Sequence, residues 1–331
     1  MSKIRIGQIG IGHNHAEGKM LSVRKFPELF EVVGYSERDP AWLEKRGGLS
    51  AYEGLPRMDE DELIAKSDAI IVESDVWNLT RTAQKCIDCG KPIHMDKPAS
   101  GTLAEYAHLL KCAEEKKLPV QLGYMYRYNP AILSCIEHIR RGDLGEIYSI
   151  NAEMSTFHSP EYRKWLQHFP GGIMYILGSH LIDLIVYILG EPEKCDAYLQ
   201  RTGLNGVDVP DLTLAVLSYK KALARVFVSS VEVNGWGRRQ FVVAGSRGTV
   251  QIMPIERKCA MTYTDTTIAT NAYADQKEIV DAPDVPDNIR YDAMMRDFYD
   301  FVQGTKQNPF TYAHELRVQK VLTQITGELT P

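Results

Sequence analysis

Asp96 and Lys97, in the segment His94-Met-Asp-Lys97-Pro98, are residue types that can do acid–base chemistry. They follow a short apolar run, residues 92–95, that we expect to be a strand. Ligands of parallel sheets bind at the carboxyl ends of the strands. A lysine held there by the following proline can donate a proton or a hydrogen bond to a substrate oxygen. The alternative is a solvated lysine in a surface turn.

A glycine-rich loop joins the first expected strand, residues 4–9, to the first expected helix, residues 16–26. In dinucleotide-binding loops the first glycine permits a tight turn. The second lets the backbone approach a pyrophosphate at the helix N-terminus. The third position of this fingerprint is usually glycine or alanine, and here it is His15. The alternative is a glycine turn in a nucleotide-free α/β protein. The cofactor contacts expected in this loop are Gly10, Gly12, His13, Asn14 and His15.

An acidic residue follows the second expected strand, residues 32–35. Glu37 lies 22 residues after His15, near the spacing of about 20 at which a carboxylate binds the ribose hydroxyls of a dinucleotide. A carboxylate there repels a 2′-phosphate, so the sequence favours NAD over NADP as the cofactor. Arg38, the next residue, leaves NADP open as an alternative.

The order of the expected elements indicates two domains. Short apolar strands alternate with helices up to about residue 123, which predicts a parallel sheet with helices on both faces. After Tyr124 the pattern changes to long strands in hairpins, such as residues 211–219 with 222–233 and 241–244 with 249–253. We therefore expect an α/β chain with an N-terminal Rossmann dinucleotide-binding domain, residues 1–123. The C-terminal α+β domain, residues 124–331, would hold a large, open, mostly antiparallel sheet, bind substrate and mediate oligomerisation.

Several motifs occur in an order that makes the sequence similar to the glucose–fructose oxidoreductase/inositol dehydrogenase (Gfo/Idh/MocA) family. Asp96 stands where members of that family usually have glutamate. The matching segments are Gly90-Lys91, Asp96-Lys97-Pro98, Gly123 to Pro130, Gly142 to Ile147, Gly171-Gly172 with His180 and Asp183, and Gly245 to Thr249.

The resemblance implies an NAD(P)-dependent oxidoreductase that transfers a hydride between nicotinamide and a secondary alcohol or ketone of a sugar, polyol or derivative. It assigns proton transfer to Lys97 and His180. It also adds Ser74, Asp96 and Lys97 to the expected cofactor contacts.

One departure from the family pattern concerns the histidine helix. Relatives carry an aspartate four residues before the histidine, on the same helix face, where it fixes the tautomer of the ring. Here that position is Ile176. Three interpretations remain open. His180 works alone or with Lys97; Tyr175 or Asp183 partly replaces the aspartate; or the chain binds cofactor without turning over a standard polyol.

Aromatic and polar residues of the second domain are candidate substrate contacts. Tyr126 and Arg127 follow a strand end beside the expected crevice. The resemblance suggests that the stretch from His158 to Trp165 approaches the substrate. The full expected set is Tyr126, Arg127, His158, Tyr162, Tyr175 and His180.

Two weaker signals suggest metal chemistry. Cys86 and Cys89 have no second pair and lie in an expected helix, so we attribute them to packing. His13 and His15 could bind a metal, but a phosphate-binding loop explains the segment better. We therefore expect no metal site.

Composition excludes other function classes. The chain has 331 residues with a net charge of -5, and lacks the basic surplus of nucleic-acid-binding proteins. No signal peptide or membrane span is evident, and six scattered cysteines favour a reducing cytoplasm. We expect a small-molecule substrate, no nucleic-acid or membrane partner, and a homodimer or homotetramer. Two alternatives stay open: a redox-assisted glycosidase or lyase that retains NAD, and a non-catalytic dinucleotide- or sugar-sensing regulator.

Overall fold

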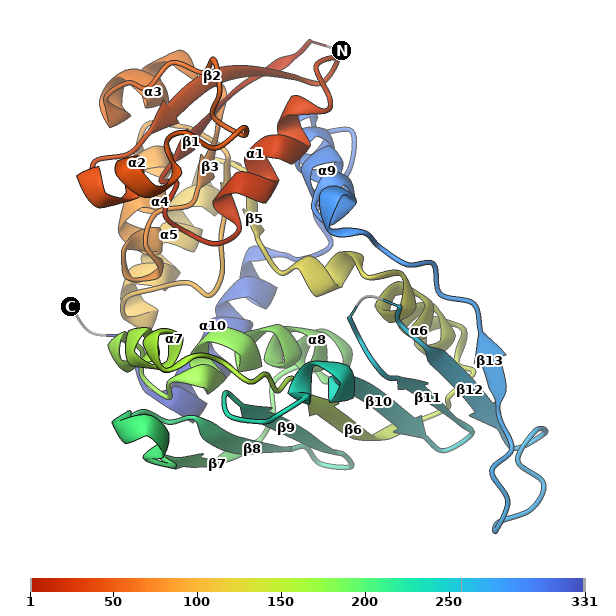
Figure 1. Ribbon diagram of the computed structural model, residues 1–331. Helices are drawn as coiled ribbons and strands as arrows, with labels where there is room; N and C mark the ends of the chain where they lie inside the picture. The colour runs from red at the N-terminus through yellow and green to blue at the C-terminus, as the bar shows by residue number, and fades with distance from the viewer. Residues whose placement is uncertain (1, 257, 330–331) are drawn as a thin grey trace. The chain divides into compact units, whose positions relative to one another are not determined.

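The computed structural model describes residues 2–256 and 258–329 (Figure 1). The chain forms two compact units. The first comprises Met1–Met125, Asp287–Gln319 and Glu328–Pro331, and the second comprises Tyr126–Pro286 and Lys320–Gly327. The chain thus returns to the first unit after residue 286, which a single boundary near Tyr124 does not describe.

A five-stranded parallel sheet forms the centre of the first unit, in the order β2-β1-β3-β4-β5. Every residue of β3, β4 and β5 is buried, as expected for a sheet covered on both faces. The strand order reverses between β1 and β3, and such a switch point is where ligands bind in open α/β sheets. The strands are β1 (Ile4–Ile9), β2 (Phe30–Ser36), β3 (Ala69–Val72), β4 (Ile93–Met95) and β5 (Val120–Leu122).

Helices cover the two faces of this sheet (Figure 1). Helix α1 packs beside α9, and α4 packs beside α5. The backbone carbonyl of Met294 in α9 accepts a hydrogen bond from Gln121 in β5, so the late segment completes the first unit. The helices are α1 (Ala16–Arg24), α2 (Pro40–Arg46), α3 (Glu60–Lys66), α4 (Leu79–Asp88), α5 (Leu103–Glu115), α9 (Asp292–Gln303) and the first half of α10 (Tyr312–Thr326).

An eight-stranded sheet forms the second unit, in the order β13-β12-β11-β10-β6-β9-β8-β7. Neighbouring strands are antiparallel except for the parallel pair β6 and β9. The strands are β6 (Ile147–Glu153), β7 (Lys194–Gln200), β8 (Leu212–Ser218), β9 (Leu223–Ser229), β10 (Gln240–Gly245), β11 (Gly248–Ile252), β12 (Met261–Asp265) and β13 (Glu278–Val280).

Three helices of the second unit are α6 (Pro130–Arg141), α7 (Pro160–Trp165) and α8 (Ser179–Leu189). Helix α8 contacts β6 and β9, and α6 contacts β11. A π-helical turn (Met174–Gly178) leads directly into α8, and such turns are frequent at functional sites.

These observations confirm the predicted fold class, a Rossmann-type parallel sheet with a second, mostly antiparallel sheet. The apolar residues Leu212, Leu214, Val216, Val226 and Val228 do not share one face of the second sheet. Val226 and Val228 are buried, whereas the other three are exposed or half-buried. In the β8–β9 register Leu214 pairs with Phe227 and Val216 with Arg225. Because cross-strand partners share a face, Val226 and Val228 lie on the inner face of the sheet.

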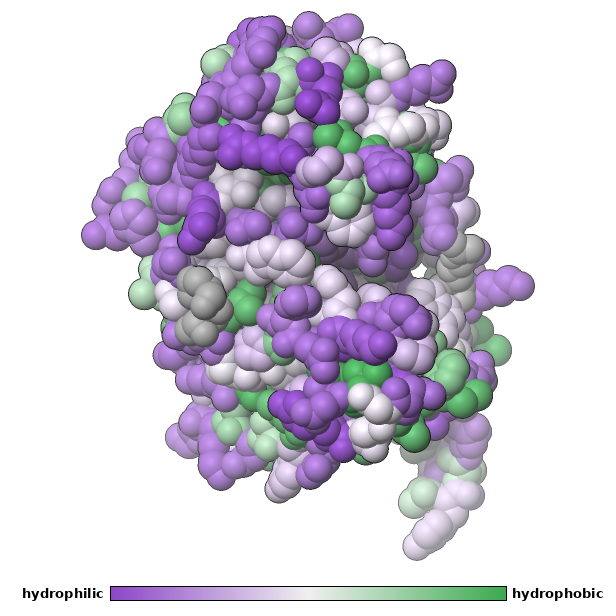
Figure 2. All heavy atoms as spheres, turned by 60° about the vertical axis from the view of Figure 1, so that its left-hand side comes forward, coloured by the Kyte–Doolittle hydropathy of each residue, from purple (hydrophilic) through white to green (hydrophobic). Residues whose placement is uncertain are grey.

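No helix among the described residues is long and apolar enough to cross a membrane. On the face of the molecule shown in Figure 2, hydrophilic side chains predominate, and the hydrophobic ones lie mostly in small separate groups.

Candidate active site

The glycine loop after β1 lies too close to its neighbours to carry side chains. Gly10 has φ +90°, and a Cβ atom there would lie 2.4 Å from the backbone of Glu73. A Cβ atom at Gly12 would lie 2.6 Å from the Trp42 ring. Helix α1 begins directly after His15. A glycine loop without side chains, at the N-terminus of a helix and at the switch point of the sheet, can bind the pyrophosphate of a dinucleotide.

Glu37 connects the end of β2 to this loop. Its carboxylate accepts hydrogen bonds from the backbone amides of Ile11 at 2.9 Å, Arg38 at 2.8 Å and Asp39 at 2.9 Å. A carboxylate has about four acceptor positions, so one remains for a ribose hydroxyl. The sequence expectation for Glu37 thus fits the geometry, although the three amide donors could not be read from the sequence.

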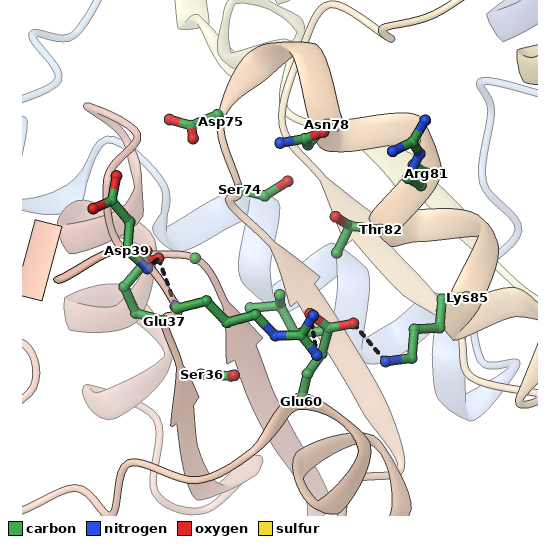
Figure 3. Close-up of a pocket in the computed structure, with 13 residues that line it drawn as sticks. Ser36, Glu37, Asp39, Glu60, Ser74, Asp75, Asn78, Arg81, Thr82 and Lys85 are labelled. Atoms are coloured by element: carbon green, nitrogen blue, oxygen red, sulfur yellow. Dashed lines mark hydrogen bonds and ion pairs between the residues drawn. The ribbon is translucent and has the colours of Figure 1, made fainter. Parts of the chain in front are cut away.

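A cavity of about 480 Å³ opens beside Glu37 (Figure 3). It lies at the carboxyl ends of β1, β2 and β3 and at the start of α4, and is lined by Ile9, Gly10, Ser36, Glu37, Arg38, Asp39, Glu60, Ser74, Asp75, Asn78, Arg81, Thr82 and Lys85. The predicted cofactor contacts Gly10, Glu37, Arg38 and Ser74 therefore line one cavity.

Glu60 neutralises two cations of this cavity. Its carboxylate lies 2.7 Å from Lys85 Nζ, as Figure 3 shows, and 3.7 Å from the Arg38 guanidinium. Both cations of the cavity are thereby engaged by a carboxylate. Sequence reasoning missed Glu60 because it lies on α3, far along the chain from the glycine loop.

Lys97 is not a solvated surface lysine, since only 3% of the residue is exposed. It follows β4, and its backbone amide donates to Asp96 Oδ1 at 2.7 Å. Just beyond it, Ser100 and Thr80 exchange three hydrogen bonds. The Asp-Lys-Pro segment is therefore fixed at the carboxyl edge of the sheet, as a proton-transferring group requires.

Asp96 belongs to a buried charged cluster in the first unit. Lys19 Nζ lies 2.5 Å from Glu73 and 3.4 Å from Asp96. His13 and His15 both contact Asp96, the latter at 3.0 Å. Sequence reasoning missed Lys19 and Glu73. The available signals were a carboxylate directly after an apolar strand and a lysine one helical turn after His15.

Burial dominates the electrostatics of this cluster. It lowers the pKa of His15 to about 3, against the opposing charge of Asp96. Burial, and then the charge of Asp96, raise the pKa of Glu73 well above its usual range. Burial also acts to raise the pKa of Asp96, but His13 and Lys19 outweigh it and hold that pKa well below its usual range.

In the second unit, His180 lies in the first turn of α8 and is 3% exposed. Its ring meets that of Tyr126 edge to face at 4.9 Å. Ile176 is buried in the π-helical turn and offers no carboxylate. Tyr175 is completely buried, and its ring stacks on Phe169 at 5.7 Å, so the structure places this expected substrate contact in the core.

Arg127 is paired with Asp183. The guanidinium donates from Nε at 2.9 Å and from Nη2 at 2.7 Å to the two carboxylate oxygens. Both side chains are 1% exposed. Asp183, which could have replaced the aspartate that relatives have at the position of Ile176, is thus bound to Arg127. The Arg127 side chain lies in the interior of the second unit.

The remaining expected substrate residues lie around a buried arginine. His158 and Tyr162 stack at 4.0 Å. Nη1 of Arg239 donates to Glu256 Oε1 at 2.5 Å. The same oxygen accepts a hydrogen bond from the Tyr126 hydroxyl. Sequence reasoning missed Arg239 and Glu256, which no motif marks. Burial, with Arg239 as a second cause, lowers the pKa of His158 to about 4, and burial raises the pKa of Tyr162 to about 12.

Comparisons with known proteins agree with this architecture. The family model described as "Oxidoreductase family, NAD-binding Rossmann fold" matches residues 4–124, and that of the "GFO/IDH/MocA C-terminal domain" matches residues 132–251. The chain belongs to the Gfo/Idh/MocA family. Its first unit is accordingly the NAD(P)-binding Rossmann domain of an oxidoreductase family.

Individual relatives of this Gfo/Idh/MocA protein are distant. An uncharacterized oxidoreductase of Schizosaccharomyces pombe is 26% identical over 75% of this chain and 70% of its own. The scyllo-inositol 2-dehydrogenase (NADP(+)) IolW of Bacillus subtilis is 28% identical over 44% of this chain and 41% of its own. An oxidoreductase from Agrobacterium radiobacter, solved in complex with NAD+, L-tartaric acid and magnesium, has the same fold. Its TM-score is 0.81 at 17% identity, over 97% of this chain and 94% of that one.

Proposed function

We propose that this protein is an NAD-preferring dehydrogenase that oxidises a secondary alcohol of a sugar, polyol or derivative, or reduces the corresponding ketone. The observation that carries the proposal is the buried Lys97, fixed beside Asp96 at the carboxyl edge of an NAD(P)-binding sheet. Dehydrogenases named for inositol among its relatives support the substrate class.

Alcohol oxidation removes a hydride from carbon and a proton from oxygen. The nicotinamide, when bound, accepts the hydride. The chain must accept the proton, and positioned acid–base groups contribute roughly 10²- to 10⁴-fold to such steps. In this proposal Lys97 and His180 handle the proton. Gly10, Gly12 and Glu37 hold the dinucleotide, and His13, Asn14 and Ser74 contact it as well.

In the second unit we assign substrate contacts to Tyr126, His158 and Tyr162. Their rings lie around Arg239 and Glu256, which hold the Tyr126 hydroxyl in place. We assign Arg127 a structural role instead, because its Nε and Nη2 donate to the two carboxylate oxygens of Asp183.

Purified protein should be assayed with NAD and NADP against a panel of inositols, aldoses, sugar acids and their keto forms, following absorbance of the reduced cofactor. We expect turnover with at least one secondary alcohol and tighter binding of NAD than of NADP. Absence of both cofactor binding and turnover across the panel would contradict the proposal.

A sensor is the second candidate, because Ile176 supplies no carboxylate and Asp183 is bound to Arg127. It predicts sugar-dependent NAD binding without turnover. A redox-assisted lyase is distinguished in the same panel, since it keeps NAD bound and consumes substrate without net release of NADH.

We also infer a homo-oligomer in a reducing compartment such as the cytoplasm. Leu212 and Leu223 are exposed on the outer part of β8 and β9, with Leu214 and Phe227 half-buried beside them. All six cysteines are unpaired thiols. Light scattering coupled to size exclusion should give a dimer or tetramer, and a monomeric mass would contradict this inference.

A further inference from the structure

The proposed function uses His13 and Asp96 but does not explain why a cluster of titratable side chains surrounds them in the first unit. This cluster brings together the glycine loop, α1 and the ends of β3 and β4. Its five members are His13, His15, Lys19, Glu73 and Asp96.

The two carboxylates each use one oxygen for donors and turn the other toward the imidazoles. Lys19 lies 2.5 Å from Glu73 Oε1 and 3.4 Å from Asp96 Oδ1. Oδ1 also accepts from the Lys97 amide. The second oxygens face the histidines: His15 Nδ1 lies 3.0 Å from Asp96 Oδ2, and His13 Nδ1 contacts Oδ2 and lies 3.6 Å from Glu73 Oε2.

The Glu73 side chain is completely inaccessible to solvent. Its oxygen Oε2 has no hydrogen-bond donor in the protein, and no solvent water can reach it. Leaving such an atom unsatisfied costs free energy. The backbone amide of His15 lies 3.3 Å from His13 Nδ1, and the same nitrogen contacts Asp96 Oδ2, so a metal ion would take the place of a proton between them. Donor atoms of His13, His15 and Asp96 therefore lie together, and Glu73 Oε2 lies 3.6 Å from one of them, His13 Nδ1.

We propose that His13, His15 and Asp96, with Glu73 as a fourth donor, bind a divalent transition-metal ion of the zinc class. Imidazole and carboxylate donors suit such ions. One donor atom from each of His13, His15 and Asp96 lies within 4.8 Å of the others. Side-chain rotation that moves these atoms apart would let them surround an ion at the ~2.0–2.2 Å of zinc ligands.

Lys19 and the backbone amide of Lys97 would orient the two carboxylates of this site. Ligating carboxylates are themselves hydrogen-bonded in metal sites, which orients the ligating oxygen. Lys19 does this for both carboxylates, and it leaves Oε2 and Oδ2 toward the metal. The sequence alone favoured a phosphate loop without metal, because the carboxylates that complete the site lie on other strands.

The test is metal binding by the full-length protein after treatment with a chelator. Titration with Co²⁺ should give visible d–d absorption that saturates at one ion per chain, and calorimetry with Zn²⁺ should give the same stoichiometry. His13→Gln and His15→Gln should each weaken binding by more than about 100-fold, since loss of a mere outer contact already costs 10- to 100-fold. His108→Gln, at an exposed histidine of α5, is the matched control and should bind like the wild type.

Zinc should also raise the Tm of the wild type, because ligands that bind only the folded state stabilise it. Folded His13 or His15 variants that bind Co²⁺ as the wild type does would overturn the proposal, as would a wild type without the absorption. Glu73→Gln, which replaces the carboxyl group with an amide of the same shape, keeps the test open if a histidine variant does not fold. It should weaken Zn²⁺ binding, and unchanged affinity would remove Glu73 from the site.

Discussion

Arg127 and Asp183 form a bidentate ion pair between the segment before α6 and the middle of α8, with both side chains about 99% buried. Arg127 follows a strand end, and from the sequence we expected it to contact substrate hydroxyls. In the structure, Nε and Nη2 of Arg127 donate instead to the buried carboxylate of Asp183. Helix α8, which carries His180, is thereby linked to the first residues of the second unit.

Removing one partner of this pair should destabilise the protein. Arg127→Ala leaves the Asp183 carboxylate buried without its partner, and such losses cost about 3–5 kcal/mol. Chemical denaturation should show this loss for Arg127→Ala and for Asp183→Ala, with non-additive effects in the double variant. If Arg127→Ala instead kept its stability and raised only the KM for substrate, Arg127 would be a substrate contact after all.

The sequence predicted those parts of the fold and site that depend on local pattern. The apolar run of residues 92–95 became β4, and the glycine pair at Gly10 and Gly12 gave the loop, because backbone conformation and burial there follow from neighbouring residues. Lys19, Glu60 and Arg239 were missed because their partners are distant in the chain. Lys19 and Glu73 are 54 residues apart, and no spacing rule connects an α1 lysine to the end of β3.

Glu60 should control the choice between NAD and NADP. Glu60→Gln removes the carboxylate beside Arg38 and one of the two carboxylates beside Lys85, so the affinity for NADP relative to NAD should rise by roughly 5- to 10-fold. A partly exposed ion pair is worth on the order of 1 kcal/mol. Fluorescence titration with both cofactors measures the ratio. Asp61→Asn is the matched control, because Asp61 also pairs with Lys85 at 2.5 Å but does not line the cavity. Equal shifts in the two variants would argue against a specific role for Glu60.

Lys97→Met should separate chemistry from cofactor binding. The methionine fills a similar buried volume but cannot transfer a proton, so kcat should fall by about 10²- to 10⁴-fold. NAD affinity should change by less than tenfold, since the glycine loop and Glu37 stay intact. Lys111→Met, at an exposed lysine of α5 whose side chain is 74% accessible, should behave as the wild type. A Lys97→Met variant with full turnover would show that another group moves the proton.

The half-buried His158 should make stability depend on pH in the acidic range. Burial, assisted by the Arg239 charge, lowers its pKa in the folded state to about 4, whereas an unfolded histidine titrates near 6.5. Between these values the unfolded chain binds more protons, so the free energy of unfolding rises with pH and falls as pH drops from about 6.5 to 4. The loss attributable to this one ring is at most about 3 kcal/mol.

Denaturant unfolding at pH 4.5 and pH 7 should show this loss in the wild type and a smaller loss in His158→Gln, which cannot gain a charge. Buried histidines such as His94, whose pKa burial also lowers, add to the slope in both proteins. The informative quantity is therefore the difference between variant and wild type at each pH. His168→Gln, at an exposed histidine ten residues farther along the chain, should retain the wild-type slope. A His158→Gln slope equal to that of the wild type would mean that the ring next to Arg239 is hydrated enough to protonate near its ordinary pKa.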